Sequence, residues 1–264
     1  MPKLQFSMRW LLLAMTIAAV TVAYISLERS KYIYQDRALQ ELQRLTDCRV
    51  ADEVEAGSPS VLGWFVSKDK FHRVLTARIG NVGEPIYPPG FLEQHLKEMP
   101  WLRAVDARWT DLDDRHVQEI VKAVPQVEHL LLFDVDVSDA GCRELSKLDS
   151  LLTLGIGEGV RSGPPPHLTP QCVIEVAKVR SLRKLIISLP DLTSKELSPL
   201  AGLTHLEVLD VSWSRVDDLA IPTLTQLRRL KRLDISETDV TAEGLHRLKQ
   251  QMPGVEIVWG RMSS

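Results

Sequence analysis

The side chains that could do chemistry in this sequence are spaced as helix caps and core residues. Asp111, Asp113 and Asp114 lie close together, but no Gly or Glu follows them at the spacing of a calcium-binding loop. They fit the first turn of a helix, where backbone amides attract carboxylates. The sequence contains no nucleophile elbow, no phosphate-binding loop and no zinc-protease helix motif. We therefore predict a protein that is not an enzyme.

The histidines and cysteines give no metal or thiol site either. The seven histidines are scattered, and none pairs with a cysteine or another histidine at metal-ligand spacing. We expect His116, His205 and His246 on solvated surfaces. Cys142 stands at a periodic apolar position and is predicted to be core, while Cys172 falls in a predicted helix. No cofactor and no metal are predicted.

The composition is that of an ordinary globular protein. The chain has 264 residues, 44% of them hydrophobic and 25% charged, with a net charge of -3. This balance excludes a collagen-like or broadly disordered chain. It also argues against nucleic acid as the main partner, because no net basic field attracts phosphate. Three cysteines are too few for a disulfide scaffold.

An internal repeat of about 24 residues dominates the chain from residue 102 onward. Its first half reads apolar, two variable, apolar, one variable, apolar, which is typical of a short strand. The pattern occurs at Leu102/Val105/Ala107, Val127/Leu130/Leu132, Leu151/Leu154/Ile156, Leu182/Leu185/Ile187, Leu206/Leu209/Val211 and Leu230/Leu233/Ile235, with a last partial copy at Val255/Val258.

The second half of each repeat predicts a turn and a short helix. A branched apolar residue is followed by a residue that can cap a helix, at Asp113, Ser138, Thr193, Asp217 and Thr241. Thr193 with Glu196 forms a capping box. One strand and one helix cannot close a core alone, so the units must stack. We predict an α/β solenoid with parallel strands on its concave face and short helices on its convex face.

These units resemble leucine-rich repeats of the 24-residue form L-x-x-L-D-L-S-x-T-x-V-T-D-x-G-L-x-x-L. Residues 230–248, LKRLDISETDVTAEGLHRL, match this form nearly throughout, and 127–145, VEHLLLFDVDVSDAGCREL, match its second half. The start of the chain, QFSMRWLLL at 5–13, is similar to the anchor of planctomycete repeat proteins. The resemblance implies protein binding as the general function.

The repeats depart from this form in two regions. Gly159 to His167, GVRSGPPPH, is an insertion that is either a solvated loop or a recognition loop. The first unit, Val74 to Gly80, is degenerate and is predicted to be a capping repeat. At the other end Pro253 and Gly254 stop the last helix, and a final edge strand follows.

The N-terminal segment predicts a single membrane anchor. Residues 10–27 are 18 uncharged residues, which fit an uncleaved transmembrane or signal-anchor helix better than a cleaved signal peptide or a buried helix. We expect the repeats outside the cytoplasm, although a count of Lys and Arg alone favours the opposite orientation. The chain thus divides into a tail (1–9), the anchor (10–27), a juxtamembrane helix and connector (28–56), an N-terminal capping region (57–101) and the repeats (102–264).

Several apolar side chains are predicted to face outward from the strands and the turns after them. They are Trp109, Leu131, Phe133, Ile186, Leu189 and Trp213. Either they form a binding patch, or some of them pack against neighbouring units. We favour a membrane-anchored, non-enzymatic repeat protein that binds a protein partner through its concave face. The alternatives are a structural element of the cell envelope and, least favoured, an enzyme whose site combines Asp210 with Asp234. The sequence does not give the oligomeric state.

Overall fold

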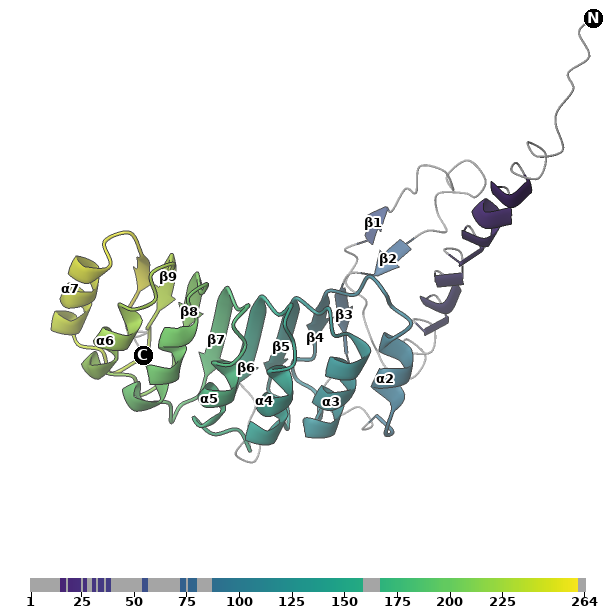
Figure 1. Cartoon of the computed structure of the whole chain (residues 1–264). Coiled ribbons are helices and arrows are strands. Elements are labelled where there is room, and N and C mark those ends of the chain that lie inside the picture. Colours follow the sequence, from purple (N-terminus) through teal and green to yellow (C-terminus); the bar gives the residue numbers. More distant parts are fainter. Residues whose placement is uncertain are drawn as a thin grey trace, which may run out of the picture.

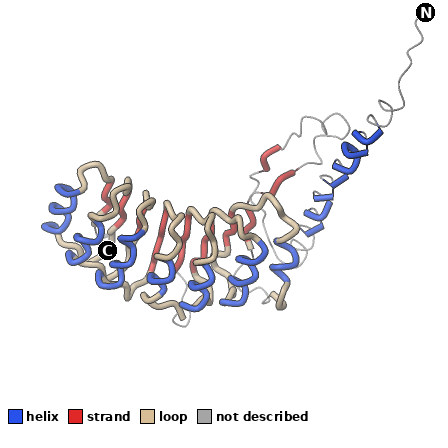
Figure 2. Tube along the Cα trace, in the orientation of Figure 1, coloured by secondary structure: helices blue, strands red, loops and turns tan. Residues whose placement is uncertain are grey.

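The repeats form a curved solenoid (Figure 1). The computed structural model describes residues 87–158 and 167–260, together with 76–79, the strands at 54–56 and 72–74, and most positions between 15 and 38. Eight parallel strands make one continuous sheet in chain order, and short helices line one face of it (Figure 2). This arrangement confirms the predicted solenoid.

Each strand is short because each repeat contributes at most two buried apolar side chains to it, and β10 contributes none. The strands of the large sheet are β3 (Thr76–Arg78), β4 (Ala104–Asp106), β5 (His129–Phe133), β6 (Thr153–Gly157), β7 (Lys184–Ser188), β8 (Val208–Asp210), β9 (Arg232–Asp234) and β10 (Glu256–Val258). The helices are α2 (Phe91–Leu96), α3 (Asp114–Ala123), α4 (Asp139–Leu145), α5 (Cys172–Val176), η3 (Ser194–Gly202), η4 (Asp218–Ala220), α6 (Ile221–Leu224) and α7 (Ala242–Gln251).

The degenerate first unit joins the sheet. Its strand β3 pairs in parallel with β4, so that Ala77 lies beside Val105. A second sheet was not predicted: β1 (Val54–Ala56) pairs antiparallel with β2 (His72–Val74) before the solenoid begins.

The register of the sheet places equivalent apolar residues of successive units side by side. Leu130, Leu154, Leu185, Leu209 and Leu233 follow one another across five strands and are fully buried. Before most strands, one carbonyl accepts two amides of the next unit: the Glu207 carbonyl accepts those of Lys231 and Arg232, at 2.7 and 3.1 Å. Each unit is thus held to the next at a fixed offset.

The last unit departs from the predicted register by one residue. The repeat pattern predicts that Val258 lies beside Leu233, but Ile257 is the residue that pairs with Leu233. The reason lies in the entry to β10, where the Lys231 carbonyl accepts only the Glu256 amide. One residue is therefore missing there, and a shift by one residue turns each side chain to the other face of a strand. Val258 consequently lies beside Asp234.

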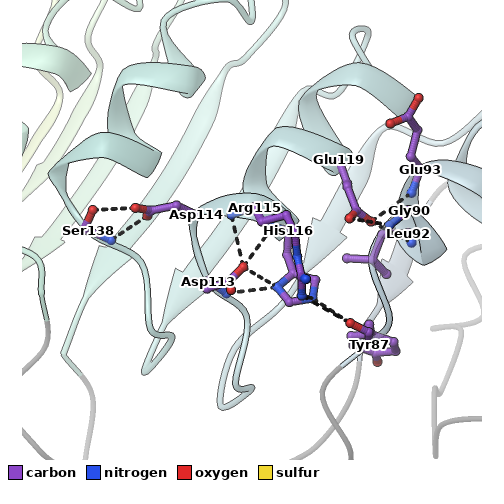
Figure 3. Close-up of polar contacts among 10 residues, drawn as sticks. All are labelled: Tyr87, Gly90, Leu92, Glu93, Asp113, Asp114, Arg115, His116, Glu119 and Ser138. Carbon is purple, nitrogen blue, oxygen red and sulfur yellow. Dashed lines mark hydrogen bonds and ion pairs between the residues drawn. The ribbon is translucent and has the colours of Figure 1, made fainter.

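A carboxylate bridge links the helix starts of neighbouring units. Asp218, the first residue after an N-cap, accepts the amide of Thr241 at 2.9 Å and its hydroxyl at 2.7 Å. Thr241 is itself the N-cap of the next helix and accepts the Gly244 amide at 3.0 Å. The same bridge joins Asp114 to Ser138 (Figure 3) and Asp139 to Thr169.

This bridge explains the glycine of the repeat motif. A Cβ atom at Gly244 would lie 2.0 Å from Oδ1 of Asp218, and one at Gly141 would lie 2.4 Å from Oδ1 of Asp114. The carboxylate of one unit therefore occupies the space that a side chain in the next unit would need. Asp218 also receives a hydrogen bond from Arg247 at 2.9 Å.

At the N-terminal end a buried glutamate replaces this bridge (Figure 3). Glu119 of α3 is 5% exposed, and its carboxylate accepts the amides of Gly90, Leu92 and Glu93 at the start of α2. Glu119 therefore satisfies backbone amides that the short helix α2 leaves open.

His116 lies beside this contact and corrects one prediction. It is fully buried, whereas we expected a solvated position. Nδ1 of His116 lies 3.1 Å from the Asp113 amide and 2.6 Å from an Asp113 carboxylate oxygen, and Nε2 lies 3.3 Å from the Tyr87 carbonyl. The imidazole faces inward because these polar groups of the N-cap and of the preceding segment surround it.

The described positions between 15 and 38 are helical and are exposed between 15 and 27. Within them no helix is both long and apolar enough to cross a membrane. Several positions of the predicted anchor, 10–14, 18 and 25, lie outside the described residues. In the connector, Gln35 and Ala38 are buried while Ile33 is half exposed, and Leu42 and Leu45 lie outside the described residues.

We predict that Asp218 and Gly244 are strongly coupled in stability. Gly244→Ala should destabilise the parent protein, because the added methyl group meets the Asp218 carboxylate. In an Asp218→Ala background the same change should be neutral or stabilise by up to about 1 kcal/mol, because alanine favours a helix over glycine. Denaturant unfolding of the four proteins measures this coupling. Gly254→Ala, where a Cβ atom meets nothing within 4 Å, is the control. Equal effects of Gly244→Ala in both backgrounds would contradict the steric account.

Candidate functional site: the open face of the sheet

The outward-facing side chains of the sheet form rows that run across the strands. One row passes from Arg78 and Asp106 on β3 and β4 to Asp210 and Asp234 on β8 and β9. Its middle members are Leu131, Gly155 and Ile186. The row therefore has charged ends and an apolar centre.

The apolar centre includes three of the predicted contact residues. Leu131, Phe133 and Ile186 are partly exposed. Gly155 lies between Leu131 and Ile186, and a Cβ atom there would lie 2.4 Å from the Phe133 ring and 2.9 Å from a Leu131 methyl group. The side chains of Leu131 and Phe133 thus cover the space above Gly155, and β5 to β7 present a continuous apolar surface.

The prediction that Leu189 faces outward is wrong, because its side chain is 2% exposed. At the equivalent turn position of other units the backbone has a positive φ, at Trp109, Asp134, Trp213 and Glu237. Leu189 does not have this conformation, and its carbonyl accepts the Leu192 amide at 3.0 Å. Its side chain consequently enters the core.

The two tryptophans are the most exposed members of the predicted face. Trp109 is 45% exposed and Trp213 is 53% exposed, each with a φ of 59°. Their turns are closed in the same way: the hydroxyls of Thr110 and Ser214 donate to the carbonyls of Ala107 and Val211, at 2.8 and 2.6 Å. The same hydroxyl recurs at Thr238.

Neither burial nor backbone preference explains tryptophan at these two positions. The left-handed conformation disfavours residues other than glycine by about 1–2 kcal/mol. Because the two indoles are 45% and 53% exposed, their burial only about offsets this strain. Large exposed aromatic side chains are typical of binding surfaces. Four strand intervals separate the two residues, a distance of about 19 Å. They therefore form two separate contact points on one face.

Trp109 is in contact with a neighbouring arginine. The Arg108 guanidinium lies 4.9 Å from the ring centroid of Trp109. Its Nε and NH2 groups donate to the two Asp106 carboxylate oxygens, each at 2.8 Å, and Arg78 donates to the same carboxylate at 3.2 Å. Partial burial opposes ionisation of Asp106, but the hydrogen bonds and charges of Arg108 and Arg78 hold its pKa below the ordinary value.

The turns in the middle of the face carry carboxylates. Partial burial and the charges of Asp191 and Asp134 raise the pKa of Glu158 above its ordinary value. Asp136 pairs with His167 at 3.6 Å. The rest of the insertion, 159–166, lies outside the described residues. The turns between the two tryptophans thus carry mainly acidic side chains.

The residues with catalytic potential are placed as structural elements. Cys142 and Cys172 are fully buried, and the neighbouring thiol together with burial raises the pKa of Cys142, so that it stays a thiol. Asp210 and Asp234 lie side by side, and each carboxylate accepts the amide two residues further on. Among the residues that the structure describes, no group of three His, Cys, Asp or Glu side chains could hold a metal ion.

Two features of the face lie beyond what the sequence predicts. The Arg108 stack depends on the left-handed turn, which no residue type at that position reveals. The position of the Phe133 ring over Gly155 depends on the pairing of β5 with β6. The nearest signal in the sequence is the recurring Asp of the repeat motif, which marks Asp210 and Asp234 but not what contacts them.

Comparisons with known proteins show similarity only among solved structures. No protein-family model matches the chain, and no curated protein matches it. Internalin C2 of Listeria monocytogenes is similar with a TM-score of 0.48 and 16% identity, over 72% of this chain and 81% of that one. A leucine-rich-repeat protein of Leptospira interrogans has a TM-score of 0.43 and 16% identity, over 65% and 39%.

A plant peptide hormone receptor in complex with RGF2 has a TM-score of 0.38 and 15% identity, over 63% and 26%. This chain therefore spans less than two thirds of the Leptospira protein and of the plant receptor. At these identities the likeness concerns the fold alone. The 24-residue period, the parallel sheet and the outer helices of the chain itself identify a leucine-rich-repeat fold.

We predict that Trp213 contributes nothing to folding stability. Trp213→Gly should leave the free energy of unfolding unchanged or raise it, because glycine adopts the left-handed conformation without strain. Leu209→Ala, a fully buried position, should lower it by about 2–5 kcal/mol. Chemical denaturation compares the two variants. A loss of more than about 2 kcal/mol in Trp213→Gly would show instead that the indole is a packing residue.

Proposed function

We propose that this chain is a non-enzymatic scaffold that binds a protein partner through the open face of its sheet. The observation that carries the proposal is the placement of Trp213, a half-exposed indole in a left-handed turn where glycine is the unstrained residue. Natural proteins retain such destabilising residues where function needs them.

The dimensions of the face fit a macromolecular partner. Eight strands at the usual spacing extend for about 34 Å, comparable to the width of a standard protein interface. An apolar centre at Leu131, Phe133 and Ile186 with charged ends matches the apolar core and polar rim of such interfaces. These features support a protein as the partner.

The scaffold proposal predicts that binding depends on the sheet face and not on the helices. Tagged full-length chain, purified in detergent, would be used to capture partners from an extract of its source cells. Trp213→Gly should lose the captured protein while keeping the parent's thermal unfolding midpoint, because it leaves the contact between Arg108 and Trp109 in place.

The matched control is Ile174→Ala/Leu219→Ala, which removes two exposed apolar side chains, at 46% and 78% exposure, from the helix side. This variant should retain the partner. Loss of the partner in the control alone would place the binding surface on the convex face and contradict the proposal.

We further propose that the N-terminal helix anchors the scaffold to a membrane, with the repeats outside the cytoplasm. Support comes from the uncharged run at 10–27 and from large apolar side chains that the rest of the described chain leaves uncovered. Val20, Val22 and Leu27 are 60–69% exposed on this helix. Exposed apolar surface of this extent needs a partner, and a lipid bilayer supplies one.

The anchor proposal predicts that two charges in the apolar run release the protein from membranes. After carbonate extraction the parent should remain in the pellet, while Val20→Lys/Val22→Lys should shift to the supernatant. Protease added outside intact spheroplasts should digest the repeats of the parent. A parent found in the supernatant would contradict anchoring, and protected repeats in a membrane-bound parent would contradict the orientation.

A further inference from the structure

Asp106 and Trp109 form a binding site for an arginine side chain, and Arg108 of the same chain occupies it. On β4 and the turn after it, the Arg108 guanidinium lies between the Asp106 carboxylate and the Trp109 ring. The carboxylate is oriented by the Arg108 amide, which donates to Asp106 Oδ1 at 3.3 Å. A bidentate ion pair and a cation–π contact thus hold the same guanidinium.

The carboxylate and the indole that hold Arg108, those of Asp106 and Trp109, form an arrangement that we call the frame. The same frame recurs four strands further on. Asp210 lies in the same row of the sheet as Asp106, connected through Leu131, Gly155 and Ile186. Its carboxylate is oriented in the same way, because the amide two residues on donates to Asp210 Oδ1 at 3.0 Å. Trp213 follows Asp210 by three residues, as Trp109 follows Asp106, and both indoles have a φ of 59°.

The second frame lacks the guanidinium. The position of Arg108 is taken by Ser212, and the position of Arg78, on the preceding strand, is taken by Ile186. Within 87–158 and 167–260, Asp210 forms no ion pair and no cation lies over the Trp213 ring. Asp234 lies beside Asp210 on β9, which places a second carboxylate next to the first.

The geometry points to Asp210 and Trp213 as the binding site for an arginine side chain of the protein partner. This inference rests on the proposed scaffold function and names the chemistry by which that face recognises its partner. The guanidinium lies flat on the Trp213 indole and donates two hydrogen bonds to Asp210, as Arg108 does at Trp109 and Asp106. The neighbouring Asp234 is already paired with Arg232 at 4.0 Å, so Asp210 is the carboxylate left for the incoming guanidinium.

Arginine fits this frame better than lysine. Its planar group presents parallel N–H donors to a carboxylate and stacks on an aromatic face at the same time. A lysine ammonium is a point charge that cannot make both contacts in this way. The exposure of Trp213, 53% against 45% for the occupied Trp109, agrees with an indole face that is open to a partner.

An arginine supplied within the chain tests the frame without a partner. Ser212→Arg should raise the thermal unfolding midpoint by about 2–4 °C, since the new side chain repeats the Arg108 contacts. The gain should vanish in Asp210→Asn and in Trp213→Ala backgrounds. Ser198→Arg, at an exposed position of η3 on the helix side, is the control and should give no gain. A gain that survives both backgrounds would overturn the inference.

Peptides test recognition from outside the chain. The detergent-purified full chain, labelled on its indole nitrogens, is titrated with acetyl-Gly-Gly-Arg-Gly-Gly-amide and with the lysine and citrulline peptides of the same length. The arginine peptide should shift the Trp213 indole signal saturably, the lysine peptide more weakly and the neutral citrulline peptide not at all. Asp210→Asn should weaken arginine binding at least about 10-fold.

The control for charge alone is Asp149→Asn, which removes an exposed carboxylate before β6 and should leave the affinity unchanged. Equal responses to arginine and citrulline, or equal weakening by Asp149→Asn, would overturn the arginine site. The scaffold function would still stand if Trp213→Gly lost the captured partner. If that variant kept the partner while the arginine peptide bound, the site would exist but not serve this partner.

Discussion

The stacking of units that cannot complete themselves is the constraint on which the rest of the solenoid depends, and a carboxylate that bridges consecutive helix starts meets it at three junctions. Asp218 binds both the amide and the hydroxyl of Thr241, and Asp114 binds Ser138 in the same way. Each bridge satisfies the N-terminus of one helix with a side chain from its neighbour, so no unit is complete alone. The carbonyl that accepts two amides of the next unit fixes the offset between most units, and with it the pairing of the strands that form the open face.

The same offset separates buried strand positions from exposed turn positions within the repeats. The inward positions of the strands are fully buried and are restricted to apolar residues by close packing. The left-handed turns at Trp109 and Trp213 are held by backbone amides and by the hydroxyls of Thr110 and Ser214. The two indoles therefore point outward, at positions where glycine would be the unstrained residue.

Repetition also lets one local frame exist in two states. Asp106 with Trp109 and Asp210 with Trp213 share backbone geometry because the units are copies of one another. The two differ in two neighbours, Arg108 against Ser212 and Arg78 against Ile186, and so in whether the chain itself neutralises the carboxylate. A difference in two side chains thus separates an occupied contact from an open one without altering the fold.

The sequence by itself determined the period, the parallel solenoid, the buried apolar positions and the caps at Asp113 and Thr241, because each repeat must bury the same stripe and close the same helix. Only the tertiary structure decided which side chains remain outside. Leu189 turns inward, His116 is enclosed, and Val258 changes face through one missing residue. These outcomes depend on φ angles at single turns and on contacts between residues 24 or more apart, and no local pattern of residue types carries that information.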